Sequence, residues 1–312
     1  MSTRRTIRSA LLSLLVLPGL LLTTSAPAAA AASQVTSPAT AAAATVGATD
    51  CSPLPLRQDE FPDQPRVDNE FLPYVPGMQL FLDGTVIEDD GTAHPHRVAT
   101  TVTDLTKVVD GVRTIVVFDV DIEDGQIVES ELFFVAQRED GSVWTLGEYP
   151  EEYEDGKLVG APSTWISGTA GARAGMAMLA HPRAGMPTYL QGFSPEIDFK
   201  DCATVFRTDQ RTCVPLNCYD HVLVVDEFAP LDPEGGHQRK FHAPGVGVVQ
   251  VGAAGGVDPE ALQLTRAAML CAAELDTVRR QVLAQDRRGY HVARDIYGAT
   301  TRAEATLGAK TC

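Results

Sequence analysis

Hairpin turns between alternating segments dominate the middle of the chain. Residues 114–122 are β-branched and alternate apolar with polar side chains, Asp124-Gly125 follows, and residues 127–137 alternate again. Asp140-Gly141 and Asp155-Gly156 precede two further segments of this kind. Asp-Gly pairs favour the two-residue turns that join twisted antiparallel strands. The pattern therefore predicts an antiparallel β meander.

Strand-like segments also flank this region. They cover residues 78–86, 96–104, 204–208, 219–228, 237–243 and 246–251. A lead-in with six prolines over residues 51–76 is predicted to be extended, because proline interrupts both helices and central strands. We read the Gly- and Ala-rich residues 168–185 as a loop. The fold class expected for residues 51–256 is mainly β, a curved antiparallel sheet or half-barrel.

The end of the chain has a different periodicity. Apolar residues recur at helical spacing, at Leu264, Ala268, Cys271, Leu275, Val278 and Val282. Asp258-Pro259 suits a helix start and Gly289 a helix end, and a weaker helix is predicted over 292–307. The sequence thus predicts a C-terminal helical segment over 257–312. Its apolar stripe either packs on the sheet or binds a partner as a short coiled coil.

The first 32 residues resemble a cleavable secretory signal. Arg4, Arg5 and Arg8 precede the apolar run 11–22, and small residues follow up to Ala32. This order is typical of export, and the apolar run is too short to span a bilayer. The general and the twin-arginine routes stay open. Residues 33–50 are predicted to be a flexible linker. We expect a secreted or envelope-associated protein without a transmembrane segment after cleavage.

Charge and cysteine content restrict the partners and the compartment. Removal of three arginines with the signal leaves 22 basic and 41 acidic residues, a net charge of −19, which disfavours nucleic acid as a partner. All six cysteines follow the signal, at positions Cys51, Cys202, Cys213, Cys218, Cys271 and Cys312. Their even number and the absence of zinc-ligand spacing favour disulfides. We predict a Cys213–Cys218 pair across a four-residue turn, Cys271 with Cys312 or Cys51, and Cys202 with the remaining cysteine.

Short motifs in the β region resemble those of a family of secreted bacterial proteins, of actinobacterial type and of unknown function. The family opens on V-D-N-P-Y-F-P-L-x-P-G, which resembles Val67-Asp68-Asn69 through Pro76-Gly77. Further matches are Ala136-Gln137, Gly147-Glu148, Glu152 to Lys157, Val214-Pro215, Asp220, Val222-Leu223 and Ala243-Pro244-Gly245-Val246-Gly247. Glu70 replaces the family's proline, Leu80-Phe81-Leu82 replaces its W-x-Y, Phe133 replaces an acidic residue, and the helical ending has no counterpart. The resemblance implies a curved β-sheet or half-barrel and does not point to any particular activity.

Catalytic motifs are absent from the sequence. It contains no G-x-S-x-G, Walker loop, H-E-x-x-H or G-x-G-x-x-G turn. His94-Pro95-His96 could offer two imidazoles to a metal, but no third ligand is identifiable, so solvated histidines are the alternative. Trp144 and Trp165 are expected in the core or lining a pocket.

Acidic residues alternate with apolar ones on both arms of the hairpin at Asp124-Gly125. If Val116, Phe118, Val120 and Ile122 point inward, a bulge at Gly125 would place Asp119 opposite Glu131 and Asp121 opposite Glu129 on the outer face. Four neighbouring carboxylates suggest weak binding of calcium, the one candidate cofactor. The alternative is a solvated acidic face with screened charges.

The sequence favours a non-catalytic binding module, with a small apolar ligand in the concavity of the sheet or weakly bound calcium. Alternatives are a secreted hydrolase with a scattered site and an interaction protein acting through the C-terminal helix. A lined cavity without convergent titratable groups would support the module. A carboxylate or histidine with a perturbed pKa in a cleft would support the enzyme. An exposed stripe from Leu264 to Val282 would support the interaction protein.

Overall fold

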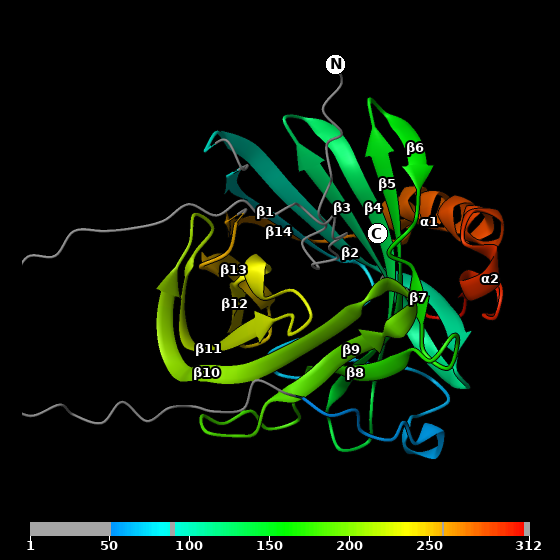
Figure 1. The fold of residues 1–312 in the computed structure, drawn as a ribbon, viewed down its shortest axis with the longest axis horizontal. Helices are drawn as coiled ribbons and strands as arrows, with labels where there is room; N and C mark the ends of the chain where they lie inside the picture. The colour runs from blue at the N-terminus through cyan, green and yellow to red at the C-terminus, as the bar shows by residue number, and fades with distance from the viewer. Residues whose placement is uncertain (1–50, 88–90, 258, 309–312) are drawn as a thin grey trace, which may run out of the picture.

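The computed structural model describes residues 51–87, 91–257 and 259–308, which form fifteen strands and five helical segments (Figure 1). The strands are β1 (Met78–Ile87), β2 (Ala93–Val109), β3 (Val112–Glu123), β4 (Gln126–Gln137), β5 (Val143–Glu154), β6 (Lys157–Gly160), β7 (Trp165–Ile166), β8 (Arg173–Met178), β9 (Tyr189–Ser194), β10 (Phe199–Cys213), β11 (Cys218–Phe228), β12 (His237–Ala243), β13 (Gly247–Ala254), β14 (Glu260–Met269) and β15 (Glu304–Ala305). The helices are α1 (Ala272–Val292) and α2 (Arg294–Tyr297), with 3-10 turns η1 (Gln58–Glu60), η2 (Pro195–Ile197) and η3 (Pro233–Gly235). The predicted signal, the predicted linker and Cys312 lie outside the described residues.

Twelve of the described strands form a closed antiparallel barrel. They follow the order β1-β14-β13-β12-β11-β10-β9-β8-β5-β4-β3-β2, and β1 pairs with β2 to complete the ring. β15 pairs with β2, and β6 and β7 pair with β5. The mainly β prediction is confirmed, but the sheet is a closed barrel and not a half-barrel.

Strand β14 explains this difference. It pairs with β1 on one side and with β13 on the other, so it fills the gap that would leave a half-barrel open. The sequence predicted a helix here because Leu264 and Ala268 lie four residues apart. In the structure Leu262 and Leu264 both point into the barrel interior, with exposed Ala261 and Gln263 beside them. Alternation with period two outweighs the helical spacing.

The C-terminal helical segment is accordingly shorter than predicted. Helix α1 begins at Ala272 and passes through Gly289, which packs against the ring of Tyr297. Within the predicted second helix, Val292 is the last residue of α1, Arg294–Tyr297 forms the short α2, and Glu304–Ala305 is a strand. The predicted loop over 168–185 likewise contains β8.

Two of the three predicted Asp-Gly turns, at Asp124-Gly125 and Asp155-Gly156, are regular two-residue turns, whereas at Asp140-Gly141 only the glycine has a positive φ. Asp124 and Gly125 have φ values of 49° and 78°, and Asp155 and Gly156 have 50° and 72°. Two successive residues in the left-handed region define the type I′ turn, which suits short hairpins. These turns fix the strand pairing of the acidic hairpin described below.

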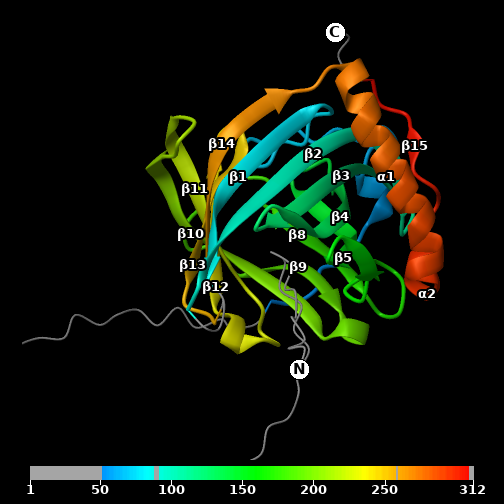
Figure 2. The ribbon, with the colours of Figure 1, turned by 90° about the horizontal axis from the view of Figure 1, so that it is seen from above.

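Apolar clusters lie on both sides of the barrel wall. One fills part of the interior and includes Val117 and Phe133. The other lies outside and includes Phe118 of β3 together with Val282 of α1 and Tyr297 of α2. Helix α1 runs along the outside of the wall (Figure 2). Both faces of β3 and β4 are therefore largely shielded from water away from the Asp124-Gly125 turn.

Ion pairs fasten α1 to the barrel wall. They are Arg279–Asp104, Lys107–Asp286 and Arg288–Glu151, with nitrogen–oxygen distances of 2.6, 2.7 and 2.6 Å. Burial lowers the pKa of Lys107 to about 8, although Asp286 opposes this shift. Leu275 and Val282 on the same helix are fully buried. The apolar stripe of α1 thus packs on the sheet, and the interaction-protein alternative loses the exposed surface that it required.

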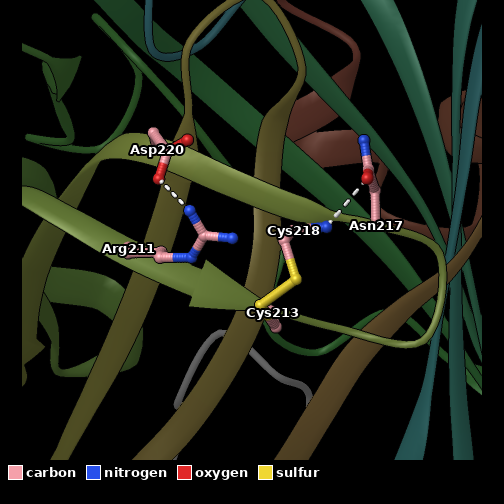
Figure 3. The surroundings of a disulfide bond; sticks show 5 residues. All are labelled: Arg211, Cys213, Asn217, Cys218 and Asp220. Atoms are coloured by element: carbon pink, nitrogen blue, oxygen red, sulfur yellow. Dashed lines mark hydrogen bonds and ion pairs between the residues drawn. A yellow bond between two sulfur atoms is a disulfide. The ribbon is translucent and has the colours of Figure 1, made fainter.

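Disulfides anchor two further segments. The predicted Cys213–Cys218 bond closes the turn between β10 and β11, next to the Arg211–Asp220 ion pair (Figure 3). Cys51–Cys202 joins the lead-in segment to β10, and Cys271 is also disulfide-bonded. Disulfides persist in oxidising compartments, which supports a location outside the cytoplasm.

Candidate functional site

The β3–β4 hairpin brings the four predicted acidic residues together. Asp119 lies opposite Glu131 and Asp121 opposite Glu129, as the alternation predicted. The extra residue is Val128, which lies between the paired Ile127 and Glu129, so the bulge is not at Gly125. Gly125 belongs instead to the regular two-residue turn.

These carboxylates point into the barrel, which corrects the predicted outward orientation. Asp121, Glu129 and Glu131 are 6%, 4% and 4% exposed, and with half-buried Asp119 they line an internal cavity. The apolar residues that were expected to point inward, such as Phe118, face α1. Alternation shows which side chains share a face, but it cannot show that a helix covers the opposite face.

Other strands add acidic side chains to the same cavity. Among the lining residues that the structure describes, eight are carboxylic acids and one, Lys240, is a lysine. The acids are Asp119, Asp121, Glu129, Glu131, Glu148, Asp201, Glu227 and Glu260. The sequence analysis missed the last four. The available signal was an acidic residue at an inward position of an apolar strand, as at Asp201 between buried Phe199 and Ala203.

Part of this cluster is paired. The Lys240 ammonium lies 2.7 Å from a Glu227 carboxylate oxygen, and the Gln191 amide donates to the other at 2.9 Å. The Trp165 indole N–H donates to Glu148 at 2.7 Å. Lys240 therefore forms an ion pair with one of the eight carboxylates, that of Glu227.

Several polar atoms of the cavity have no hydrogen-bond partner among the described residues. They include Glu129 Oε2, Asp119 Oδ1, Glu260 Oε1 and His242 Nε2. His242 is 2% exposed, and its other ring nitrogen lies 3.1 Å from the carbonyl oxygen of Phe71. Buried polar atoms are normally paired with protein, water or ligand.

The predicted histidine pair is split between two environments. His94 lies 2.8 Å from the carboxylate of Asp124 at the hairpin turn. His96 is buried near the acidic cluster, with nitrogens 3.7 Å from Asp121 and 3.9 Å from Glu260. Burial alone would lower the pKa of His96, but these carboxylates raise it above its usual value.

Burial also changes the acids. It raises the pKa of Asp119, Glu148 and Glu260 to about 7 each. The pKa values of Glu129 and Glu131 lie well above the usual range, because both are buried and because neighbouring carboxylates repel a further charge. Near neutral pH the cavity therefore holds both protonated and ionised carboxyl groups.

The rest of the cavity is apolar. Leu80, Leu82, Val98, Phe133 and Leu262 contribute to its lining, and its volume is about 180 Å³. The acidic positions lie towards the end of the barrel where the Asp124-Gly125 turn joins β3 to β4. The cavity lining is thus amphipathic, with apolar Leu82 and Val98 on the strands beside Asp121.

The segment before β1 covers the other end. Tyr74 from this segment lines the cavity. The carbonyl of Glu70 accepts a hydrogen bond from the Gly245 N–H at 2.7 Å, and the carbonyl of Phe71 lies beside His242. Two of the motifs that resemble the secreted family, at 67–77 and 243–247, therefore meet at this end.

The acidic residues of the cavity do not form a metal-binding geometry among the described residues. In this part of the chain no group of three or more His, Cys, Asp or Glu side chains is arranged to hold a metal ion. The four acids of the predicted calcium site are neighbours, but their oxygens do not converge on one point.

Comparisons with known proteins identify no family. No family model and no curated protein matches the chain. A predicted lipoprotein from Parabacteroides distasonis is similar with a TM-score of 0.37 and 12% identity, over 64% of this chain and 99% of that one. A predicted exported protein with a YmcC-like fold from Bacteroides fragilis has a TM-score of 0.34 and 11% identity, over 64% and 99%. Such low TM-scores carry no information about function. Within the described residues no helix is long and apolar enough to cross a membrane.

Proposed function

We propose that the mature protein is a secreted, non-catalytic binding module that holds a small ligand inside the barrel. The observation that carries this proposal is the amphipathic cavity of about 180 Å³ within a closed, disulfide-linked barrel. An engineered protein cavity of about 150 Å³ binds benzene, so this space suits a ligand of that scale. The export signal predicted at the N-terminus and the disulfides support action outside the cytoplasm.

A blocked cavity tests the proposal. Ala177 lines the cavity, and Ala177→Phe should fill part of it. Ala261 is exposed on the neighbouring β14, so Ala261→Phe is the matched control. Ligand-detected NMR with benzyl alcohol and with benzylammonium should show binding to wild type and to the control. Ala177→Phe, if it folds with an unchanged circular dichroism spectrum, should bind neither probe. Absence of binding to all three proteins would overturn the proposal.

An acid–base enzyme is the second candidate, because the carboxyl pKa values near 7 meet the criterion that the sequence analysis set for an enzyme. A carboxyl group with a raised pKa beside an ionised one is the arrangement that glycoside hydrolysis uses. The test is turnover of a panel of 4-nitrophenyl glycosides by wild type and Glu148→Gln. Hydrolysis that falls at least about a hundred-fold in the variant would establish the enzyme. Its absence favours the binding module.

Weak calcium binding by Asp119, Asp121, Glu129 and Glu131 stays a prediction, with a dissociation constant on the order of 10⁻⁴–10⁻³ M. Thermal unfolding with chelator and then with millimolar calcium tests it. The expected shift in wild type should vanish in Asp121→Asn/Glu129→Gln, because ligand binding to the folded state raises its stability. An equal shift in both proteins would reject the site.

A further inference from the structure

The cavity has a large imbalance of formal charge. Eight carboxyl groups line it, and Lys240, which is committed to Glu227, is the one lysine or arginine among the lining residues described. Transfer of unpaired carboxylates from water into a protein interior is unfavourable unless a positive charge or hydrogen bonds compensate. Without such compensation, buried carboxyl groups stay protonated. The raised pKa values of Glu129 and Glu131 indicate this state here.

Unpaired atoms mark where a compensating group would bind. Glu129 is 4% exposed, lines the cavity, and its Oε2 has no partner among the described residues. Asp119 Oδ1 on β3 has no hydrogen-bond partner among the described residues, and Glu260 Oε1 on β14 has none either, although a ring nitrogen of His96 lies 3.9 Å from it. In their ionised form all three groups are acceptors only, so a ligand that holds them ionised must donate hydrogen bonds.

The remaining lining limits the ligand further. Leu80, Leu82 and Phe133 offer no hydrogen bonds, and their surface favours contact with carbon. The volume exceeds the space of a single ion and compares with cavities that accept one aromatic ring. The combined requirement is a donor group with positive charge joined to a small apolar body.

We propose that the ligand of this cavity is a small organic cation, whose ammonium or amidinium group donates to Asp119, Glu129 and Glu260 while its apolar part packs against Leu80 and Phe133. This inference rests on the proposed function and names the chemical class of the ligand. Charge-assisted hydrogen bonds are stronger than neutral ones, and a low-dielectric site strengthens them.

An organic cation fits better than a metal ion. Calcium binds six to eight oxygen ligands, and the distances from these oxygens to the ion differ by only a few tenths of an ångström. The lining carboxylates are spread over six strands, and among the described residues no three of them are arranged to hold a metal ion. An ammonium group needs fewer hydrogen-bond acceptors than calcium, and these can be more widely spaced. Only an organic cation also has an apolar part that can pack against the apolar lining.

The test compares three probes of matched shape: benzylammonium, benzyl alcohol and benzoate. Isothermal titration calorimetry with the mature chain near pH 8 should give the order ammonium, alcohol, benzoate, with about ten-fold or more between the first two. Glu129→Gln/Glu131→Gln keeps the shape of the cavity and should bring the ammonium close to the alcohol. The control Glu154→Gln changes the exposed last residue of β5 and should not change the order. Thermal unfolding of each variant verifies folding.

The outcomes separate this inference from the proposed function. Equal affinity for ammonium and alcohol, both lost in Ala177→Phe, would reject the cation and retain the binding module. A preference for ammonium that survives unchanged in the double variant would also reject the inference, because Glu129 would then not be an acceptor of the cation. Calcium binding without ammonium binding would replace the organic cation by a metal. Absence of binding by all three probes would reject the proposed function itself.

Discussion

Asp121 on β3 and Glu129 on β4 lie directly opposite each other, and both side chains are buried inside the barrel. Like charges at opposing positions of antiparallel strands destabilise the pair, and removal from water increases the effect. A packed core would place apolar residues here. The proposed binding function would account for carboxylates at these positions, at the expense of the stability of the free protein.

The stability of the ligand-free protein should fall as pH rises from about 6.5 to about 8. Burial raises the carboxyl pKa values of Asp119, Glu148 and Glu260 to about 7. The folded state then binds more protons than the unfolded state, so the free energy of unfolding decreases as these groups ionise. His96, with its raised pKa, acts in the same direction. His242, whose pKa burial lowers to about 4, acts oppositely, but only below its ordinary value of 6.5.

Urea unfolding across this range measures the effect. Glu129→Gln/Glu131→Gln should be more stable than wild type near pH 8 by about 1–3 kcal/mol, the usual scale for an uncompensated buried polar group. The two proteins should converge towards pH 5, where the wild-type carboxyls are protonated. A wild-type stability that rises steadily up to pH 8 would contradict the assignment of these acids to the interior.

Loss of one partner of the buried ion pair beneath α1 should be strongly destabilising. Lys107 and Asp286 are almost fully buried, and Asp286 also accepts a hydrogen bond from the Tyr297 hydroxyl. Asp286→Ala leaves a buried ammonium without its counter-charge, which costs about 3–5 kcal/mol. The control Arg280→Ala removes an exposed ion pair to Asp276 and should change stability by less than about 1 kcal/mol. Similar losses in both variants would mean that the pair is not buried in solution.

The two described disulfides should differ in their contribution. Cys51–Cys202 closes a loop of 151 residues and Cys213–Cys218 a loop of 5. Because a longer closed loop restricts the unfolded chain more, replacing the first pair by serine should destabilise by about 3 kcal/mol more than replacing the second. Chemical unfolding of the two double variants measures this difference. A larger loss at Cys213–Cys218 would show that this bond acts on the folded β10–β11 turn.

Local patterns predicted the strands well, because hairpin chemistry acts over few residues. The Asp124-Gly125 turn and the pairing of Asp119 with Glu131 follow from turn type and alternation alone. The segment 237–243 coincides with β12, since an alternating run bounded by turns has few other solutions.

Long-range relations could not be predicted in the same way. The barrel closes because β14 pairs with β1, some 180 residues away in the sequence. The helical spacing of Leu264 and Ala268 led to the prediction of a helix in place of this strand. The orientation of the acidic hairpin depends on α1, which covers the face of Phe118. Asp201, Glu227 and Glu260 are far apart in sequence, and only the closed ring brings them into one cavity.

A crystal structure of the mature protein grown with benzylammonium near pH 8 tests the central claim most directly. We expect the probe inside the barrel, with its nitrogen within about 3 Å of a carboxylate oxygen of Asp119, Glu129 or Glu260, the distance of a charge-assisted hydrogen bond. Its ring should contact Leu80 or Phe133. A probe bound only on the outer surface, or a barrel interior that is fully occupied by protein side chains, would contradict the account.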